Sequence, residues 1–362
     1  MTKLGDEDVL EVAGEEEENE VAVVYDIATY PSDLTLSGIV DLNKTNDIII
    51  PDFQRNFVWT IKKSSLLIES FLLGLPVPQV FFYIDDENRN LVIDGQQRIL
   101  SIVYYFDGYF GSENIHGKRQ VFRLKGLDEK SPYFNKKFVE LDEKSQRKLK
   151  ASVLRAMNVR QLSPSDDSTS IYHIFERLNT GGVALTSQEI RNCVFRGQFV
   201  KILRKLNNEK AWRSIIGKKT FDKHQKDVEL ILRIFSLSHG AWKTYEKPMK
   251  EFLNKSMKRH NKGSTDEVKR FQMRFKKAAV LIVDTLGEKP FHVRGPLNAS
   301  IMDSVFCTIL SSLSKIPDDL AKRYQKLLAD KEFTDSTYYG TSDVTVLGKR
   351  FTRARKILLD LD

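Results

Sequence analysis

The sequence is poor in cysteine and lacks long apolar runs. Its two cysteines, Cys193 and Cys307, lie far apart in the 362-residue chain, and neither belongs to a CxxC or Cys/His cluster. We therefore expect neither a disulfide framework nor a structural zinc site. No apolar run approaches the roughly 20 residues that cross a bilayer. The first residues are acidic, whereas a signal peptide is basic and then apolar. These absences predict a cytoplasmic protein without a membrane segment.

Acidic residues are concentrated at the start of the chain. The first twenty residues carry nine acids against one lysine, and the formal net charge of +8 therefore leaves +16 for the rest. A body this basic favours an anionic partner such as nucleic acid or nucleotide. Residues 1–20 are expected to form an acidic, disordered tail.

Strand-like patterns are confined to the first half of the chain. A strand is expected over 21–28, a second at 48–50, and a hairpin over 79–94, with helices at 35–43, 64–73, 96–106 and 142–151. After residue 166 the patterns are helical, at 168–178, 187–196, 225–238, 247–260, 265–286, 299–313 and 318–329. The sequence therefore predicts an α+β protein, with a mixed α/β domain over 21–165 and a mostly helical domain over 166–362.

The stretch VIDGQQRIL places a polar pentapeptide, Asp94 to Arg98, between two apolar runs. A structural interpretation is a capping box, with Asp94 as the N-cap of the helix and Gln97 reaching back to the backbone. This interpretation leaves Gln96 unexplained. It also leaves Arg98 unexplained, because a positive charge in the first turn opposes the helix dipole.

A phosphate site is the functional interpretation of the same five residues. The free N–H groups of a helix N-terminus bind anions, and Gly95 would let a phosphate approach the backbone. Arg98 would add a bidentate guanidinium for phosphate oxygens. One of the two glutamines, Gln96 or Gln97, could orient a water. Asp94 could act as a base or hold a magnesium-bound water.

Two further stretches concentrate polar groups among apolar ones. PDFQRNFVW, residues 51–59, contains Gln54 and Arg55, and alone it also fits an edge turn packed by aromatic residues. FERLNTGGVALTSQEIRN, residues 175–192, joins two predicted helices by a glycine turn that also fits a helix C-cap. Around this turn lie more polar groups than capping needs: Arg177, Asn179, Glu189 and Arg191.

The order PxFQRxxxW, IDGQQR and FxRLNTGGxxLxxQEIRN resembles the GmrSD-type restriction endonuclease N-terminal domain family, which is itself similar to the ParB/sulfiredoxin-like fold. The resemblance covers roughly residues 35–200. It implies an NTPase that binds and hydrolyses a nucleoside triphosphate, with Mg²⁺, in a bacterial or phage-related defence system. By this resemblance the catalytic residues are Asp94, Gln97 and Arg98. The nucleotide-binding residues are Gly95, Gln96, Gln54, Arg55, Asn179, Thr180, Gly181 and Gly182.

The chain departs from the best-known members of that family, which carry or pair with a His-Asn-His nuclease domain. None of its six histidines lies in such a motif. Its own nuclease activity is therefore in doubt, and cleavage would be supplied by a partner nuclease. Lys/Arg-rich stretches at 247–263, 268–279 and 348–356 predict either solvated helix faces or a DNA-binding surface that contacts phosphates without reading sequence.

Two alternatives to the NTPase stay open at this stage. The first is a ParB-like DNA-binding or nicking protein, in which DGQQR contacts a DNA phosphate. The second is a non-catalytic nucleotide-sensing adaptor that recruits an effector. The sequence does not specify which triphosphate is preferred, whether DNA stimulates turnover, or the oligomeric state.

Overall fold

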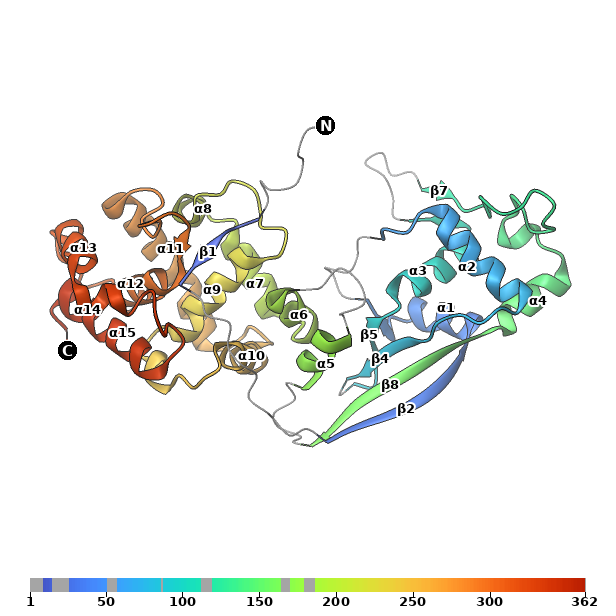
Figure 1. The fold of residues 1–362 in the computed structure, drawn as a ribbon, viewed down its shortest axis with the longest axis horizontal. Coiled ribbons are helices and arrows are strands. Elements are labelled where there is room, and N and C mark those ends of the chain that lie inside the picture. The colour runs from blue at the N-terminus through green and yellow to red at the C-terminus, as the bar shows by residue number, and fades with distance from the viewer. Residues whose placement is uncertain are drawn as a thin grey trace. The chain divides into compact units, whose positions relative to one another are not determined.

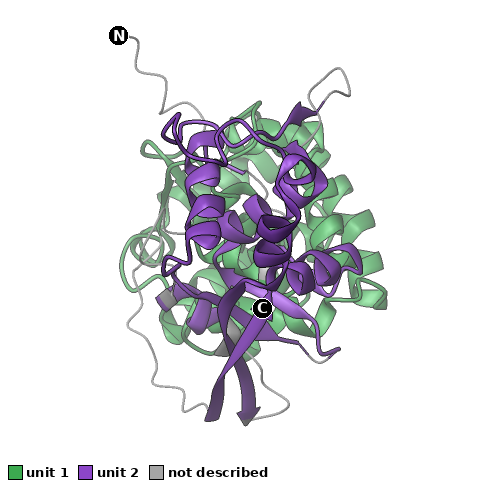
Figure 2. Cartoon of the chain, turned by 90° about the vertical axis from the view of Figure 1, so that its right-hand side faces the viewer, with its two compact units in different colours: residues 1–23, 185–362 green, residues 24–184 purple. Residues whose placement is uncertain are grey.

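The computed structural model describes residues 9–14, 26–50, 57–85, 87–111, 119–163, 170–178 and 186–361. Contacts between residues divide the chain into two compact units, Val24–Ala184 and Met1–Val23 with Leu185–Asp362 (Figure 2). The change in sequence character near residue 165 precedes this division after residue 184. The first unit contains the sheet and the second is mostly helical, which confirms the predicted mixed α/β region followed by a helical region.

The α/β unit is built on one five-stranded sheet, with the strand order β2-β8-β4-β5-β3. The β4 strand is antiparallel to β5 and parallel to β8, whereas β2 and β8 form a long antiparallel pair. Figure 1 shows this sheet with the helices of the unit around it. The elements are β2 (Asp26–Thr35), α1 (Leu36–Lys44), β3 (Ile48–Ile49), α2 (Ile61–Leu73), β4 (Val80–Ile84), β5 (Asn90–Asp94), α3 (Gln96–Asp107), β6 (Tyr109–Phe110), β7 (Gln120–Val121), η2 (Phe138–Glu140), α4 (Glu143–Ala151), β8 (Val153–Ser163) and α5 (Ser170–Leu178).

The core of this unit lies between the sheet and helices α1, α2 and α3. Side chains from alternate strand positions, Val80 and Phe82 on β4 and Val92 on β5, pack against Ile99 and Ile102 of α3. Leu91, Val92 and Ile93 are all buried, so β5 is covered on both faces, and α5 contacts it. The middle of β5 is therefore enclosed by the packing on both of its faces.

The helical unit is organised around two helices that are buried along nearly their whole length, α9 and α12. An ion pair joins them, because Arg233 on α9 donates to Asp303 on α12 at 2.6 Å. The elements of this unit are β1 (Val12–Ala13), α6 (Ser187–Val194), α7 (Gln198–Asn207), α8 (Lys210–Ile216), α9 (Lys226–Leu237), η4 (Ala241–Thr244), α10 (Met249–His260), α11 (Asp266–Leu286), β9 (Leu297–Asn298), α12 (Ala299–Ser311), α13 (Leu320–Ala329), α14 (Lys331–Asp335) and α15 (Val344–Leu359). Among the described residues, no helix is long and apolar enough to span a membrane.

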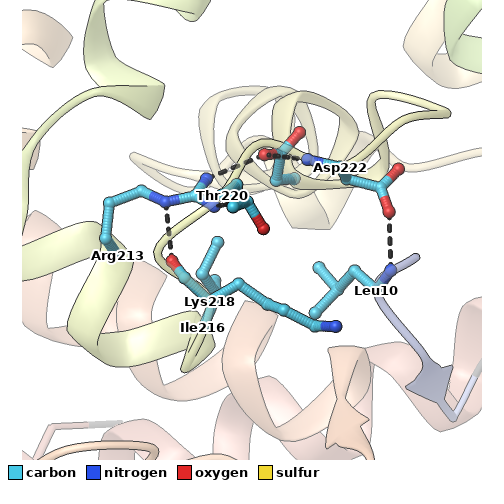
Figure 3. Close-up of a pocket in the computed structure, with 7 residues that line it drawn as sticks. Leu10, Arg213, Ile216, Lys218, Thr220 and Asp222 are labelled. Atoms are coloured by element: carbon cyan, nitrogen blue, oxygen red, sulfur yellow. Dashed lines mark hydrogen bonds and ion pairs between the residues drawn. The ribbon is translucent and has the colours of Figure 1, made fainter. Parts of the chain in front are cut away.

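Residues 9–14 belong to the helical unit, although they fall within the stretch expected to be a disordered tail. Val12 and Ala13 pair in parallel with Leu297 and Asn298. Leu10 is buried in the helical core, and its N–H donates to the Asp222 carboxylate at 2.6 Å (Figure 3). An apolar side chain and a strand hydrogen-bonding pattern therefore anchor a segment whose overall composition is acidic.

Helix α6 carries the QEIRN residues, and its polar side chains have structural roles. Glu189 accepts from the N–H of Thr186 at 2.8 Å in a capping box that starts the helix. Arg191 is buried and donates to Glu229 on α9 at 2.7 Å. Burial alone would raise the pKa of Glu229, but the charges of Lys226 and Arg191 lower it to about 2. Of the polar residues near the glycine turn, Glu189 thus caps α6, and Arg191 forms a buried ion pair within the helical unit.

Replacing Arg191 by methionine is expected to lower the free energy of unfolding of the helical unit by about 3 kcal/mol, since it leaves Glu229 buried with one cation fewer. Urea unfolding followed by tryptophan fluorescence measures the change, because Trp212 and Trp242 lie in this unit. The matched control is Arg196→Met, at an exposed position just after the same helix. Its change should stay within about 0.5 kcal/mol. Equal effects of the two variants would contradict a structural role for the Arg191 ion pair.

Candidate functional site

The DGQQR residues lie where β5 ends and α3 begins (Figure 1). Asp94 is the last residue of β5 and pairs with Phe81 of β4. Gly95 makes the turn in a left-handed conformation, with φ +99°, and is the N-cap of α3. The first helical hydrogen bond runs from the N–H of Ile99 to the carbonyl of Gly95 at 3.0 Å. The strand therefore enters the helix through a single residue.

The expected capping box is wrong. Asp94 is not the N-cap, and no side chain caps the helix. The reason is that Asp94 still belongs to the strand ladder, so the turn comes one residue later than expected. Among the described residues no side chain caps α3, and an uncapped helix N-terminus is a place where anions bind in proteins.

Two features require a glycine at position 95: its left-handed backbone conformation and the closeness of the Val80 side chain. A Cβ on Gly95 would lie 2.2 Å from Cγ1 of Val80 and 2.7 Å from its Cβ. The side of Gly95 that was expected to receive a phosphate is therefore filled by Val80, the first residue of β4. The glycine sets the close approach between β4 and the turn, and this explains its place in the motif without a ligand.

Arg98 and Asp94 form an ion pair across the turn. The Nη2 atom of Arg98 lies 2.7 Å from the Asp94 carboxylate and also donates to the carbonyl of Gln79 at 3.0 Å. The Arg98 side chain is mostly covered, whereas that of Asp94 is about half exposed. The carboxylate thus offsets the unfavourable position of a cation in the first helical turn. The Nε atom of Arg98 is buried and has no hydrogen-bond acceptor.

The two glutamines of the motif differ in their surroundings. Gln97 accepts hydrogen bonds through Oε1 from the N–H groups of Val58 and Trp59, at 3.0 and 3.1 Å. Gln96 is buried, with 8% of its surface exposed, and its Nε2 atom has no hydrogen-bond partner. Buried donors without acceptors are rare in proteins and require a specific explanation. Gln97 thus fixes the segment that follows PDFQR, and Gln96 presents an unused donor.

The structure therefore brings together five of the predicted site residues, Asp94 to Arg98. The other predicted nucleotide-binding residues, Gln54, Arg55, Asn179, Thr180, Gly181 and Gly182, lie outside the described residues. The segment that follows Gln54 and Arg55 is described and is anchored on α3, because the Phe57 ring packs edge-on against Tyr104 at 5.1 Å. Residues that contribute through backbone atoms, such as Gln79 and Val58, carry no signal in the sequence.

Residues 36–196 match the family model described as the N-terminal domain of GmrSD restriction endonuclease. This match covers the α/β unit from α1 onward and extends through α6. No curated protein matches the chain. A solved structure of a Pnob8-like ParB-N domain aligns at 11% identity over 90% of this chain and 99% of that chain, with a TM-score of 0.21. A TM-score this low does not establish a shared fold.

The Gly95–Val80 contact is expected to make Gly95→Ala strongly destabilising. Gly108, at the other end of α3, is the matched control: its φ is +79°, but no atom lies within 4 Å of its Cβ position. Gly108→Ala should cost about 1–2 kcal/mol from backbone strain, and Gly95→Ala should cost more because it adds a steric clash. Thermal and urea unfolding of both variants measure the difference. In the Val80→Ala background the extra cost of Gly95→Ala should shrink, and a purely additive double variant would contradict the contact.

Proposed function

We propose that the chain binds and hydrolyses nucleoside triphosphates at the DGQQR turn, as a module of a DNA restriction system. One observation carries the proposal: the first turn of α3 contains two buried donors, Gln96 Nε2 and Arg98 Nε, that find no acceptor among the described residues. An unsatisfied buried donor costs roughly 1–3 kcal/mol. A phosphate bound at the helix N-terminus would supply acceptor oxygens to such donors. The matched restriction-endonuclease family supports the DNA setting.

Arg98 is proposed to bind the triphosphate by exchanging partners. In the ligand-free geometry its guanidinium is held by the Asp94 carboxylate and the Gln79 carbonyl. An incoming phosphate would compete with Asp94 for the guanidinium. The released carboxylate, already about half exposed, could then accept the proton of a water that attacks the terminal phosphorus. The bond from this phosphorus to the bridging oxygen would break, yielding inorganic phosphate and a nucleoside diphosphate.

The two glutamines receive different proposed roles. Gln96 is proposed to contact the phosphate or the attacking water, because its amide donor is unused. Gln97 is proposed to act by position, because its Oε1 atom is occupied by two backbone N–H groups. It would hold the segment after Gln54 and Arg55 against α3. Gln54, Arg55 and the loop from Asn179 to Gly182 remain proposed as further binding residues.

Magnesium fits this site through Asp94. The described residues contain no cluster of three or more His, Cys, Asp or Glu side chains that could hold a metal ion by themselves. Mg²⁺ usually keeps several waters and takes one or two carboxylates together with substrate phosphates. The half-exposed Asp94 carboxylate could hold one of these magnesium-bound waters by a hydrogen bond. Bound there with the nucleotide, Mg²⁺ would neutralise part of the triphosphate charge.

DNA is proposed to contact the basic helices of the helical unit. On α11 and α15 the exposed cations include Lys269, Lys276, Lys349 and Lys356. Exposed lysines and arginines bind DNA phosphates without reading sequence, and their binding weakens with salt. Because no histidine stands in a His-Asn-His pattern, cleavage is proposed to come from a partner nuclease.

Arg98→Ala is expected to lower the rate of phosphate release from nucleoside triphosphates by about 10²-fold, the loss typical of removing one electrostatic donor from an active site. Release would be measured for each of the four ribonucleoside triphosphates with Mg²⁺, with and without plasmid DNA. The matched control is Arg89→Ala, just before the start of β5. Arg89 forms an ion pair with Asp85 at 2.8 Å, and these two residues are four positions apart, as Arg98 and Asp94 are.

Three outcomes would sink or redirect this proposal. Full activity in Arg98→Ala would remove DGQQR from the chemistry. Tight triphosphate binding without release would favour a nucleotide-sensing adaptor. Nucleotide-stimulated cleavage of the plasmid by the chain alone would favour a ParB-like nicking protein.

Substitutions of the two glutamines are expected to affect phosphate release and the free energy of unfolding differently. Gln96→Leu is expected to lower phosphate release while leaving the free energy of unfolding unchanged or higher, because it removes an unsatisfied buried donor. Gln97→Leu should instead lower that free energy by about 1–3 kcal/mol, since two backbone N–H groups lose their acceptor. Steady-state kinetics and urea unfolding of the two variants test this contrast. A stability loss in Gln96→Leu as large as that in Gln97→Leu would argue that Gln96 is structural.

A further inference from the structure

The helical unit contains a cavity of about 710 Å³, formed by residues of α9, η4, α10 and α11 and of the segments beside them. Its volume falls within the range of about 300–1,000 Å³ that is usual for small-molecule sites. None of its lining residues belongs to DGQQR, PDFQR or the glycine turn. The cavity therefore needs its own explanation.

Three cations without protein partners line this cavity. They are Lys255 and Arg259 on α10 and Arg270 on α11. None of the three makes a hydrogen bond or an ion pair with any described residue. Lys255 and Arg259 also stand four residues apart on one helix, where like charges repel. Cations that are not held by protein partners at a concave site can bind the oxygens of an anion.

The acidic residues of the cavity are mostly engaged elsewhere. Glu267 lies 3.3 Å from Nε2 of His260, and Glu251 accepts from Asn254 at 2.9 Å. The third lining carboxylate belongs to Glu246, which is exposed and forms no hydrogen bond or ion pair with the described residues. One lining lysine, Lys247, pairs with Asp343 at 3.3 Å. The charges that remain for a ligand are therefore the three cations Lys255, Arg259 and Arg270, beside the carboxylates of Glu246 and Glu267.

The pKa of His239 is affected by arginines near the cavity. Desolvation lowers the pKa of His239, and the guanidinium groups of Arg274 and Arg270 lower it further, against the opposing effect of Glu267. His239 lines the same cavity. The cations thus act on the interior of the cavity as well as on bulk solvent.

The buried part of the cavity is aromatic, with two hydroxyl groups. Phe235 and Phe271 are buried and pack edge to face, with ring centroids 5.0 Å apart. The hydroxyls of Ser236 and Ser256 lie 2.8 Å from each other. An aromatic floor receives a planar or apolar group, whereas hydroxyls and cations receive phosphate oxygens. The combination is complementary to a ligand that carries both.

From this arrangement we propose that the helical unit binds a phosphorylated small molecule with a planar ring, held by Lys255, Arg259 and Arg270 over the aromatic floor. This site is separate from the proposed NTPase turn and does not depend on it. A nucleoside monophosphate is the simplest probe with this chemistry. The bound ligand would join α10 to α11 and thereby stabilise the helical unit.

Isothermal titration calorimetry of the full chain without Mg²⁺ tests the proposal, with AMP, GMP, adenosine and pyrophosphate as probes. At least one monophosphate should bind, more tightly than adenosine or pyrophosphate alone. Arg259→Met and Arg270→Met should each weaken this binding at least tenfold. Lys277→Met is the matched control, because Lys277 is an exposed cation on α11 that does not line the cavity. Lys277→Met should bind as the unchanged chain does. Arg98→Ala serves to distinguish the two sites, because binding at the cavity should persist when the DGQQR turn is altered.

Several results would overturn the proposal. Binding that is lost in Arg98→Ala but kept in Arg259→Met and Arg270→Met would place the nucleotide at DGQQR instead. Absence of binding to the unchanged chain for all probes at millimolar concentration would leave the cavity without a small-molecule role. If a DNA duplex then lost affinity in Arg259→Met and Arg270→Met, the cations would belong to a nucleic-acid surface. Failure of the NTPase assay alone would leave this proposal unaffected.

Discussion

The close approach of Gly95 to Val80 sets the geometry on which the DGQQR turn depends. A left-handed residue at the end of β5 lets α3 start within one residue of the strand, and the Val80 side chain occupies the place of a Cβ. Any other residue at position 95 would push β4 away from the turn. The carbonyl of Gln79, which accepts a hydrogen bond from Arg98, would move together with β4. The charged part of the motif is thus positioned by an apolar contact between two strands.

The arginines of the matched family segment serve different purposes. Arg191 is fully enclosed and bound to Glu229 together with Asn254 and Gln188, so its exchange for another partner would require opening the helical core. Arg98 instead pairs with a carboxylate that is half in solvent, and it keeps one buried nitrogen free. Only the second arrangement allows a ligand to replace a protein partner at modest cost. Burial therefore separates the structural arginine of the segment from the one suited to chemistry.

Sequence patterns located the elements well where apolar spacing was regular. The 79–94 hairpin, the helix after DGQQR and the buried helices at α9 and α12 follow directly from such spacing. The long strand β8 was missed as a single strand, because its inward positions include Asn158 and its outward positions are charged. Helices α7 and α8 were also missed, although their buried residues recur at helical spacing: Phe199, Leu203 and Leu206 in α7, and Trp212, Ile215 and Ile216 in α8.

The candidate site was less predictable than the fold. The motif itself was visible, but the assignment of Asp94 to the cap failed because a turn can shift by one residue without any change in composition. The contrast between Gln96 and Gln97 depends on backbone N–H groups of Val58 and Trp59, which no side-chain pattern encodes. The cavity between α9, α10 and α11 arises from helix packing, so the basic stretches alone gave no hint of a concave surface.

The pairing of β1 with β9 has a consequence for how the chain is assembled during synthesis. Val12 and Ala13 are made first, but their partners Leu297 and Asn298 emerge only after the entire α/β unit. The α/β unit is thus an insertion within the sequence of the helical unit. It can fold before β9 has been synthesised and can pair with β1. Deleting the first twenty residues would leave the Leu297 edge unpaired and the Leu10 position in the core empty. Expression of residues 185–362 alone would therefore yield an incomplete helical unit.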